Sequence, residues 1–176
     1  MSALLEIDDV RVSFSLRSGL LSSAGSIDAV SGVSLKIEEG QTYGIVGESG
    51  SGKSTLARAI TGLHHASEGS IRYRGQELKG LPEKEFRKLR KEIQIIFQDP
   101  YSSLNPRLTV GASIMEPMKV HKLFNTADER KTKALEILEC VGLSAEHFNR
   151  YPHEFSGGQR QRIGIARTIA VEPKLI

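Results

Sequence analysis

The stretch Gly47-Glu48-Ser49-Gly50-Ser51-Gly52-Lys53-Ser54-Thr55 decides the fold, because it follows the pattern G-x-x-x-x-G-K-[ST]. Glycines let a backbone curl until successive N–H groups point inward at an anion. Lys53 adds a mobile positive charge, and the hydroxyl of Ser54 can ligate Mg²⁺. The loop therefore predicts a site for the phosphates of a nucleotide. It does not distinguish a transporter ATPase from a kinase, a GTPase or a repair ATPase.

The residues on either side of this loop have the periodicities of a strand and of a helix. The run from Thr42 to Val46 is short and apolar, which predicts a strand that leads into the loop. Beyond Lys53, apolar residues recur three and four positions apart, as on one face of a helix: Leu56, Ala59, Ile60 and Leu63. A strand, a loop and a helix in this order are what a P-loop fold requires. Such a helix presents free N–H groups and the positive end of its dipole to the loop.

The sequence before the loop predicts two strands. Residues 3–16 alternate between apolar and polar positions, and four apolar residues fall on one face: Val10, Val12, Phe14 and Leu16. Residues 17–28 are rich in glycine and serine and predict a loop. Residues 33–37 alternate again and end at the turn of residues 38–40.

After the loop, the sequence first predicts both strands and a helix and then helices alone. Residues 69–75 and 93–97 predict strands, and residues 83–91 predict a charged helix between them. The pairs Asp99-Pro100 and Asn105-Pro106 then break the chain, and from Thr109 onward the signals are helical.

The C-terminal third predicts two further helices. Thr126 with Glu129 forms a capping box, and Gly142 closes that helix. A second helix is predicted from Ser156 to a point before Pro173, and residues 174–176 resemble the start of a strand. The fold class is therefore α/β, a P-loop (RecA-like) core with an N-terminal antiparallel β subdomain and a helical subdomain. The expected parts are residues 1–98, 99–155 and 156–176.

Composition excludes several classes of protein. The 176 residues have a net charge of only +3, which gives no argument for a nucleic-acid partner. The single cysteine, Cys140, rules out an internal disulfide and fits a reducing compartment. No apolar run is long enough to span a membrane, and a signal peptide is missing, so we expect a soluble, cytosolic chain.

A second anion site is predicted near the start of the last helix. In Phe155-Ser156-Gly157-Gly158-Gln159 the serine is a good N-cap, and the two glycines leave the N–H groups of the helix unshielded. This stretch resembles the signature motif of the ATP-binding cassette (ABC) family, L-S-G-G-Q, with Phe155 in place of the leucine. Residues 47–55 resemble that family's Walker A loop, and Gln98 resembles its Q-loop glutamine. The resemblance covers essentially the whole chain.

The resemblance implies roles for these residues. Two ABC domains pair head to tail, so that residues 47–55 of one and Ser156–Gln159 of the other enclose one ATP. Gln98 is expected to contact Mg²⁺ and the attacking water. Phe14 matches the family's adenine-stacking aromatic only roughly, and packing in the core with Val10 is the other role open to it. Three arginines are expected to pair with acids or to face the partner domain: Arg160, Arg162 and Arg167.

Two segments indicate which branch of the ABC family the chain resembles. Residues 98–107 and 151–154 resemble ATPase subunits of bacterial importers for di- and oligopeptides and of related nickel importers. The resemblance implies membrane permease partners, a peripheral location on the cytoplasmic face of the inner membrane, and no nucleic acid. It names neither the transported solute nor whether the partner ATPase is a second copy or a sister subunit.

The family's Walker B Asp, catalytic Glu and switch His do not occur before Ile176. The resemblance thus implies ATP hydrolysis by a longer form and little or none by these residues alone. Two alternatives stay open, namely a nucleotide-binding fragment that does not hydrolyse ATP and an ABC ATPase outside transport. A DNA-repair ATPase is disfavoured, because Gln98 and Ser156 are too close in sequence to enclose a long coiled coil.

Overall fold

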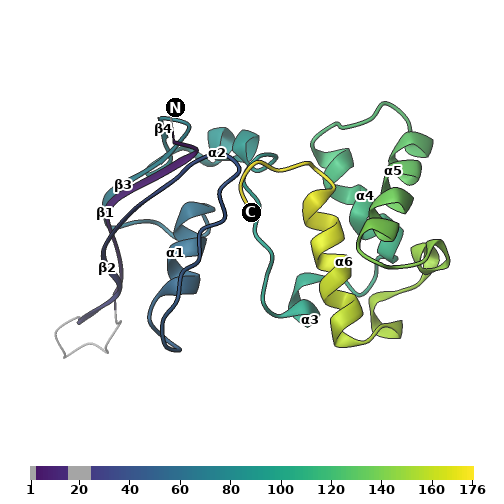
Figure 1. Cartoon of the computed structure of the whole chain (residues 1–176), viewed down its shortest axis with the longest axis horizontal. Coiled ribbons are helices and arrows are strands. Elements are labelled where there is room, and N and C mark those ends of the chain that lie inside the picture. The colour runs from purple at the N-terminus through teal and green to yellow at the C-terminus, as the bar shows by residue number, and fades with distance from the viewer. Residues whose placement is uncertain (1–2, 16–24) are drawn as a thin grey trace, which may run out of the picture. The chain divides into compact units, whose positions relative to one another are not determined.

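An antiparallel sheet with the strand order β2-β1-β3-β4 is built by the N-terminal part of the chain (Figure 1). The computed structural model describes residues 3–15 and 25–176. Its strands are β1 (Leu5–Ser15), β2 (Ser26–Ile37), β3 (Glu68–Tyr73) and β4 (Gln76–Glu77). Helix α1 (Lys53–Ile60) buries Leu56 and Ala59, and α2 (Glu83–Leu89) buries Phe86. The N-terminal β subdomain and the helix after the loop are thus confirmed.

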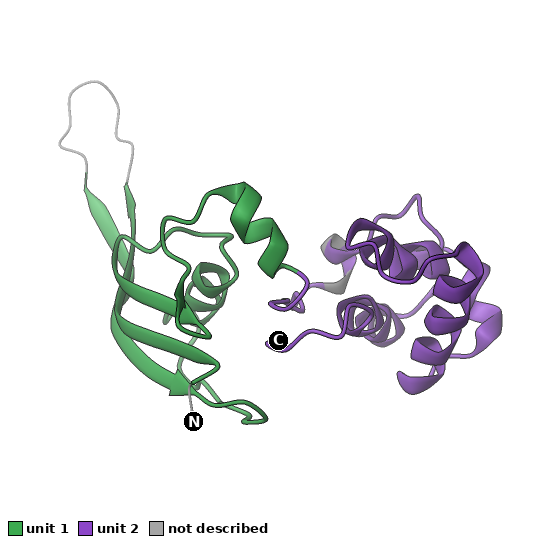
Figure 2. Cartoon of the chain, turned by 90° about the horizontal axis from the view of Figure 1, so that it is seen from above, with its two compact units in different colours: residues 1–90 green, residues 91–176 purple. Residues whose placement is uncertain are grey.

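The described chain divides into two compact units, residues 1–90 and 91–176 (Figure 2). The sheet, α1 and α2 belong to the first unit, and every later helix belongs to the second. The division lies between Arg90 and Lys91, whereas the sequence placed a boundary after residue 98. Each unit has its own apolar core.

The predicted strand over residues 42–46 is wrong for this structure, which has no regular element there. A strand exists only with a hydrogen-bonded neighbour, and within residues 3–15 and 25–176 no strand pairs with this segment. Its apolar side chains are correspondingly uncovered, with Ile45 45% and Val46 96% exposed. Apolar composition alone therefore did not suffice to make a strand.

The predicted strand over residues 93–97 is reduced to an isolated parallel bridge between Ile93 and Leu175. Gln94 N donates to Leu175 O at 2.9 Å, so the C-terminal residues do begin to pair in the manner of a strand. Ile93 is buried and Phe97 is exposed. As for residues 42–46, a strand does not form because it lacks a hydrogen-bonded partner of sufficient length. Among the described residues, the short segment around Leu175 forms a bridge with Ile93 only.

Three smaller expectations for the first unit also change. Ser26–Asp28, predicted as loop, belong to β2, while Leu16 and most of the predicted loop lie outside the described residues. Helix α1 ends at Ile60, so Leu63 leaves its apolar face and is exposed. Phe14 is 42% exposed, unlike the fully buried Val10 and Val12, because it lies near the end of β1 opposite Ile27, which is itself 53% exposed.

The second unit is helical. Its elements are α3 (Pro100–Ser103), α4 (Val110–Val120), α5 (Ala127–Cys140), the 3₁₀ turns η1 (Ala145–Asn149) and η2 (Pro152–Glu154), and α6 (Gly157–Ile169). The Thr126–Glu129 capping box and the left-handed Gly142 after α5 are confirmed. The fully buried residues Ile114, Leu138 and Ile163 bring α4, α5 and α6 into one core. This core holds α6 in place, and Ser156 is the N-cap of that helix.

Among the described residues, none of the helices combines the length and the apolar character needed to cross a bilayer.

Candidate nucleotide-binding site

The loop over residues 47–52 is held open by backbone conformations that favour glycine. Gly50 and Gly52 have φ angles of 83° and 90°, in the left-handed region. A Cβ on Gly52 would lie 2.1 Å from the carbonyl oxygen of Ala29 in β2, which is closer than any real contact. A Cβ on Gly47 would lie 2.8 Å from Ser51 Oγ. Gly52 therefore brings the start of α1 against β2, and this contact fixes the position of the loop in its unit.

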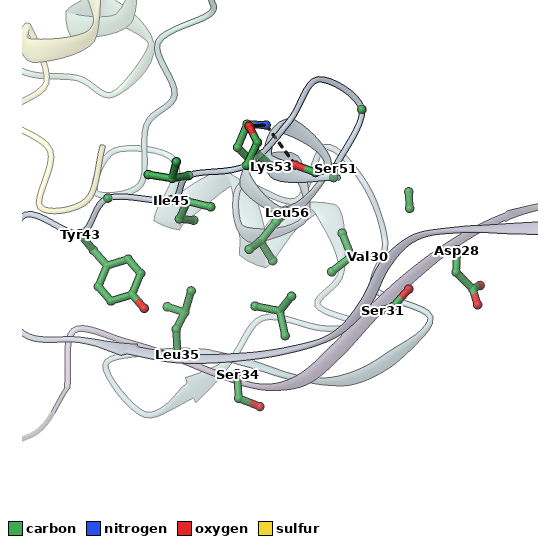
Figure 3. A pocket seen from close by; sticks show the side chains of 17 residues that line it. Asp28, Val30, Ser31, Ser34, Leu35, Tyr43, Ile45, Ser51, Lys53 and Leu56 are labelled. Atoms are coloured by element: carbon green, nitrogen blue, oxygen red, sulfur yellow. Dashed lines mark hydrogen bonds between the residues drawn. The ribbon is translucent and has the colours of Figure 1, made fainter.

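Lys53 folds back over the loop that precedes it. Its Nζ donates to Gly47 O at 2.8 Å and to Glu48 O at 2.5 Å. It also donates to Ser51 Oγ at 3.0 Å (Figure 3). These acceptors are neutral, and hydrogen bonds to a charged phosphate oxygen are shorter and stronger. An anion that enters the loop can therefore replace these acceptors and bind the Lys53 ammonium group.

The first turn of α1 supplies the other groups that a phosphate chain needs. Gly52 caps the helix without a side chain, and Leu56 N donates to Gly52 O at 2.8 Å as the first helical hydrogen bond. The amides before Leu56 have no intrahelical acceptor and are available to an anion. The Ser54 side chain is exposed in this turn, and Thr55 follows it half-buried. Glu48 and Ser49 lie exposed in the loop.

A cavity of about 570 Å³ lies between β2 and the segment that leads into the loop (Figure 3). Gly47, Gly52 and Lys53 line it on the loop side. Its apolar wall is made by Val30, Leu35, Tyr43, Ile45 and Leu56. The loop therefore borders a space of the size of a small-molecule site.

Phe14 lies at the end of β1 near this cavity. Its neighbour Ser13 donates from Oγ to Asp28 Oδ1 at 2.7 Å, and Asp28 lines the cavity. Phe14 is 42% exposed, and its ring meets the ring of His64 edge-on with the centroids 5.3 Å apart. Phe14 is thus partly accessible to a ligand, and His64 is its aromatic neighbour.

The second predicted anion site is the N-terminus of α6. Ser156 Oγ accepts from Gln159 N at 3.3 Å, and Gln159 Oε1 accepts from Ser156 N at 3.0 Å, which is a reciprocal capping box. Gly157 and Gly158 follow the cap, and a Cβ on either would meet nothing within 4 Å. Neither has a positive φ. Among the described residues, nothing in the fold requires glycine at these two positions.

Comparison with known proteins identifies the family of this chain. The ABC transporter family matches residues 30–176, which is most of the chain. This chain belongs to the ABC transporter family. The oligopeptide transport ATP-binding protein AppF of Bacillus subtilis is 50% identical over 175 residues, which are 98% of this chain and 53% of AppF. The oligopeptide transport ATP-binding protein OppF of Escherichia coli is 48% identical over 176 residues, with shares of 98% and 53%.

A solved ABC structure has the same fold. The ATP-binding cassette MJ0796, in a dimeric post-hydrolysis state bound to ADP and Pi, matches with a TM-score of 0.84 and 32% identity. The match covers 96% of this chain and 70% of that cassette. This ABC chain spans about half the length of the curated relatives it matches, since 53% of both AppF and OppF is covered.

The remaining predicted site residue, Gln98, belongs to the second unit of the ABC chain. It is exposed and stands two positions before α3. Asp99 caps that helix, because Asp99 Oδ1 accepts from Tyr101 N at 2.9 Å. Gln98 and Ser156–Gln159 thus lie in one unit, and Phe14 and residues 47–55 lie in the other.

Sequence reasoning missed the partners of three arginines in this ABC chain. Arg162 Nη1 donates to Gly142 O at 3.3 Å, and Arg167 Nη1 donates to Ser103 O at 2.5 Å. Burial lowers the pKa of the Arg167 guanidinium, and the charge of Glu116 opposes that shift, so this arginine does have an acid nearby. Arg160 stacks on an aromatic ring. No sequence pattern could have identified these acceptors, because most are backbone carbonyls that only the fold brings close.

Proposed function

We propose that this chain binds Mg·ATP in residues 47–55 and presents Ser156–Gln159 to the ATP held by a second ABC ATPase subunit. Phe14 stacks on the adenine, Lys53 holds the phosphates, and Gln98 contacts Mg²⁺ and the attacking water. In its longer form the protein hydrolyses ATP and couples hydrolysis to the import of di- or oligopeptides, or of a related small solute.

The observation that carries the proposal is the open N-terminus of α6. A glycine within a helix destabilises it by about 1 kcal/mol relative to alanine, yet neither Gly157 nor Gly158 is required by packing or by φ. Gly52, in contrast, is required by its contact with Ala29. Glycines that no intramolecular contact explains are best explained by a ligand that approaches the backbone from outside the chain. ATP bound to a partner subunit is such a ligand.

The residues present also fit Mg²⁺. Mg²⁺ keeps several waters and is usually bound through few protein ligands together with substrate phosphates. Ser54 and Gln98 are the side chains that we propose as its ligands.

The proposed cargo and partners rest on the relatives. AppF and OppF are oligopeptide transport ATP-binding proteins and are about half identical to this chain. We accordingly propose membrane permease subunits as partners, a peripheral position on the cytoplasmic face of the membrane, and no nucleic-acid ligand.

The substitution Gly158→Asp tests the composite site. An aspartate in the first turn favours the helix dipole, so the variant should unfold at the same denaturant concentration as the wild type or higher. The same charge repels a phosphate of the partner's ATP. Mg·ATP-dependent self-association, measured by analytical ultracentrifugation, should weaken about tenfold or more, which corresponds to about 1.4 kcal/mol.

Ala127→Asp is the matched control, because it adds the same charge to the exposed first turn of α5. It should associate like the wild type. If Gly158→Asp associates as strongly as the control, the signature does not contact nucleotide in this chain.

A further inference from the structure

Two arginines of α6 hold the short segment that follows Gln98. The guanidinium carbon of Arg160 lies 4.2 Å from the centroid of the Tyr101 ring. Arg167 Nη1 donates to Ser103 O at 2.5 Å. Arg160 and Arg167 are about two helical turns apart and share a face of α6. They therefore contact α3 at two points, the ring of Tyr101 and the carbonyl oxygen of Ser103.

Arg160 is also linked to the signature. It stands one turn after Ser156, and Arg160 N donates to Ser156 O at 2.9 Å, so its position is tied to the capped first turn of α6. Tyr101 stands three positions after Gln98, in a segment whose start is capped by Asp99. The stacked pair thus connects the two parts of the second unit that carry proposed nucleotide-contacting groups.

Stability alone does not account for an arginine at this position. Its Nε atom is buried and has no hydrogen-bond partner among the residues that the structure describes. A buried N–H without an acceptor destabilises a fold. Two contacts oppose this cost, and both are modest: the cation–π contact involves a Tyr101 that is 65% exposed, and the hydrogen bond from Arg160 Nη2 to His153 O is long, at 3.5 Å. An apolar side chain of similar length would fill the same space without the unpaired group.

We infer that Arg160 is a positioning residue, which through Tyr101 fixes the segment after Gln98 against the first turn of the signature helix. The distance between Gln98 and Ser156 then stays the same when nucleotide binds. The inference rests on the proposed function, because it assumes that both ends of this link contact ATP or its Mg²⁺.

Three variants of the chain test the inference: Arg160→Met, Tyr101→Ala and Tyr101→Phe. Arg160→Met keeps an unbranched side chain as far as the position of Nε and removes the guanidinium and its charge, and Tyr101→Phe keeps the ring. Arg160→Met and Tyr101→Ala should weaken Mg·ATP-dependent self-association about tenfold. Both should leave the affinity of the monomer for a fluorescent ATP analogue within about twofold, because residues 47–55 lie in the other unit. Tyr101→Phe should restore association to within about twofold of the wild type.

A purely structural role for Arg160 predicts a different pattern. It predicts that Arg160→Met unfolds at a lower denaturant concentration, whereas the positioning role predicts a midpoint that is unchanged or raised. Wild-type association in Arg160→Met, or equal losses in Tyr101→Ala and Tyr101→Phe, would overturn the inference.

Hydrogen exchange of the nucleotide-free chain separates this inference from the proposed function. Arg160→Met should speed amide exchange in residues 99–104 as well as in residues 157–161, by about tenfold in both. If only residues 157–161 respond, the link does not exist. If both segments respond but the wild type shows no ATP-dependent association, the link stands and a composite nucleotide site between two copies of this chain is refuted.

Discussion

Replacing Lys53 with alanine is expected to weaken Mg·ATP binding by about 100-fold. Hydrogen bonds to charged groups contribute about 1.5–3 kcal/mol, and each 1.4 kcal/mol is a factor of ten in affinity. The Lys53 ammonium is held at the mouth of the loop by Gly47 O, Glu48 O and Ser51 Oγ, so it is already placed for an incoming phosphate. Isothermal titration calorimetry with Mg·ATP measures the loss directly.

Lys88→Ala is the control for the loss of one positive charge. Lys88 pairs with Glu85 on the exposed face of α2 and lies outside the nucleotide loop. Its replacement should change ATP affinity by less than about twofold, since exposed ion pairs contribute little. If the Lys53 and Lys88 variants bind Mg·ATP with equal affinity, residues 47–55 are not the phosphate site.

Gly52→Ala is expected to destabilise the first unit by about 3 kcal/mol or more. An L-residue with side chain in the left-handed region costs about 1–2 kcal/mol, and Gly52 has a φ of 90°. The new Cβ would also lie 2.1 Å from Ala29 O, so β2 or the start of α1 must move, and such overpacking typically costs about 1–3 kcal/mol. Urea unfolding followed by circular dichroism measures the change.

Gly44→Ala serves as the matched glycine, because its φ is not positive and a Cβ there meets nothing within 4 Å. We expect its unfolding midpoint to stay close to that of the wild type. A Gly52 variant as stable as the Gly44 variant would mean that the close approach of α1 to β2 does not hold the loop in place.

Features set by a few neighbouring residues were predictable from the sequence. The loop and helix after residue 52, the capping box at Thr126 and the N-cap at Ser156 each depend on side chains at most three or four positions apart. The four-stranded sheet was also predictable in part, since buried and less buried residues alternate in β1 on either side of Asp8 and Asp9 and in the last residues of β3. These local rules predicted the residues of both proposed anion sites.

Features that depend on distant partners were not predictable. Residues 42–46 are as apolar as a strand, yet no described strand pairs with them, and residues 93–97 find only Leu175. The exposure of Phe14 depends on its cross-strand neighbour Ile27, which composition does not reveal. The acceptors of Arg162 and Arg167 are carbonyl oxygens supplied by other turns and helices. In each case the missing information is the identity of a neighbour in space.

The central claim is that one ATP is enclosed by residues 47–55 of one subunit and Ser156–Gln159 of another. Mixing the Lys53→Ala chain with the Gly158→Asp chain tests it most directly, because a head-to-tail pair of these variants retains one intact site. Analytical ultracentrifugation in Mg·ATP should show association of either variant alone that is at least about tenfold weaker than that of the wild type, and a tighter nucleotide-dependent heterodimer in the mixture. A mixture that stays monomeric, under conditions in which the wild type associates, would contradict the composite site.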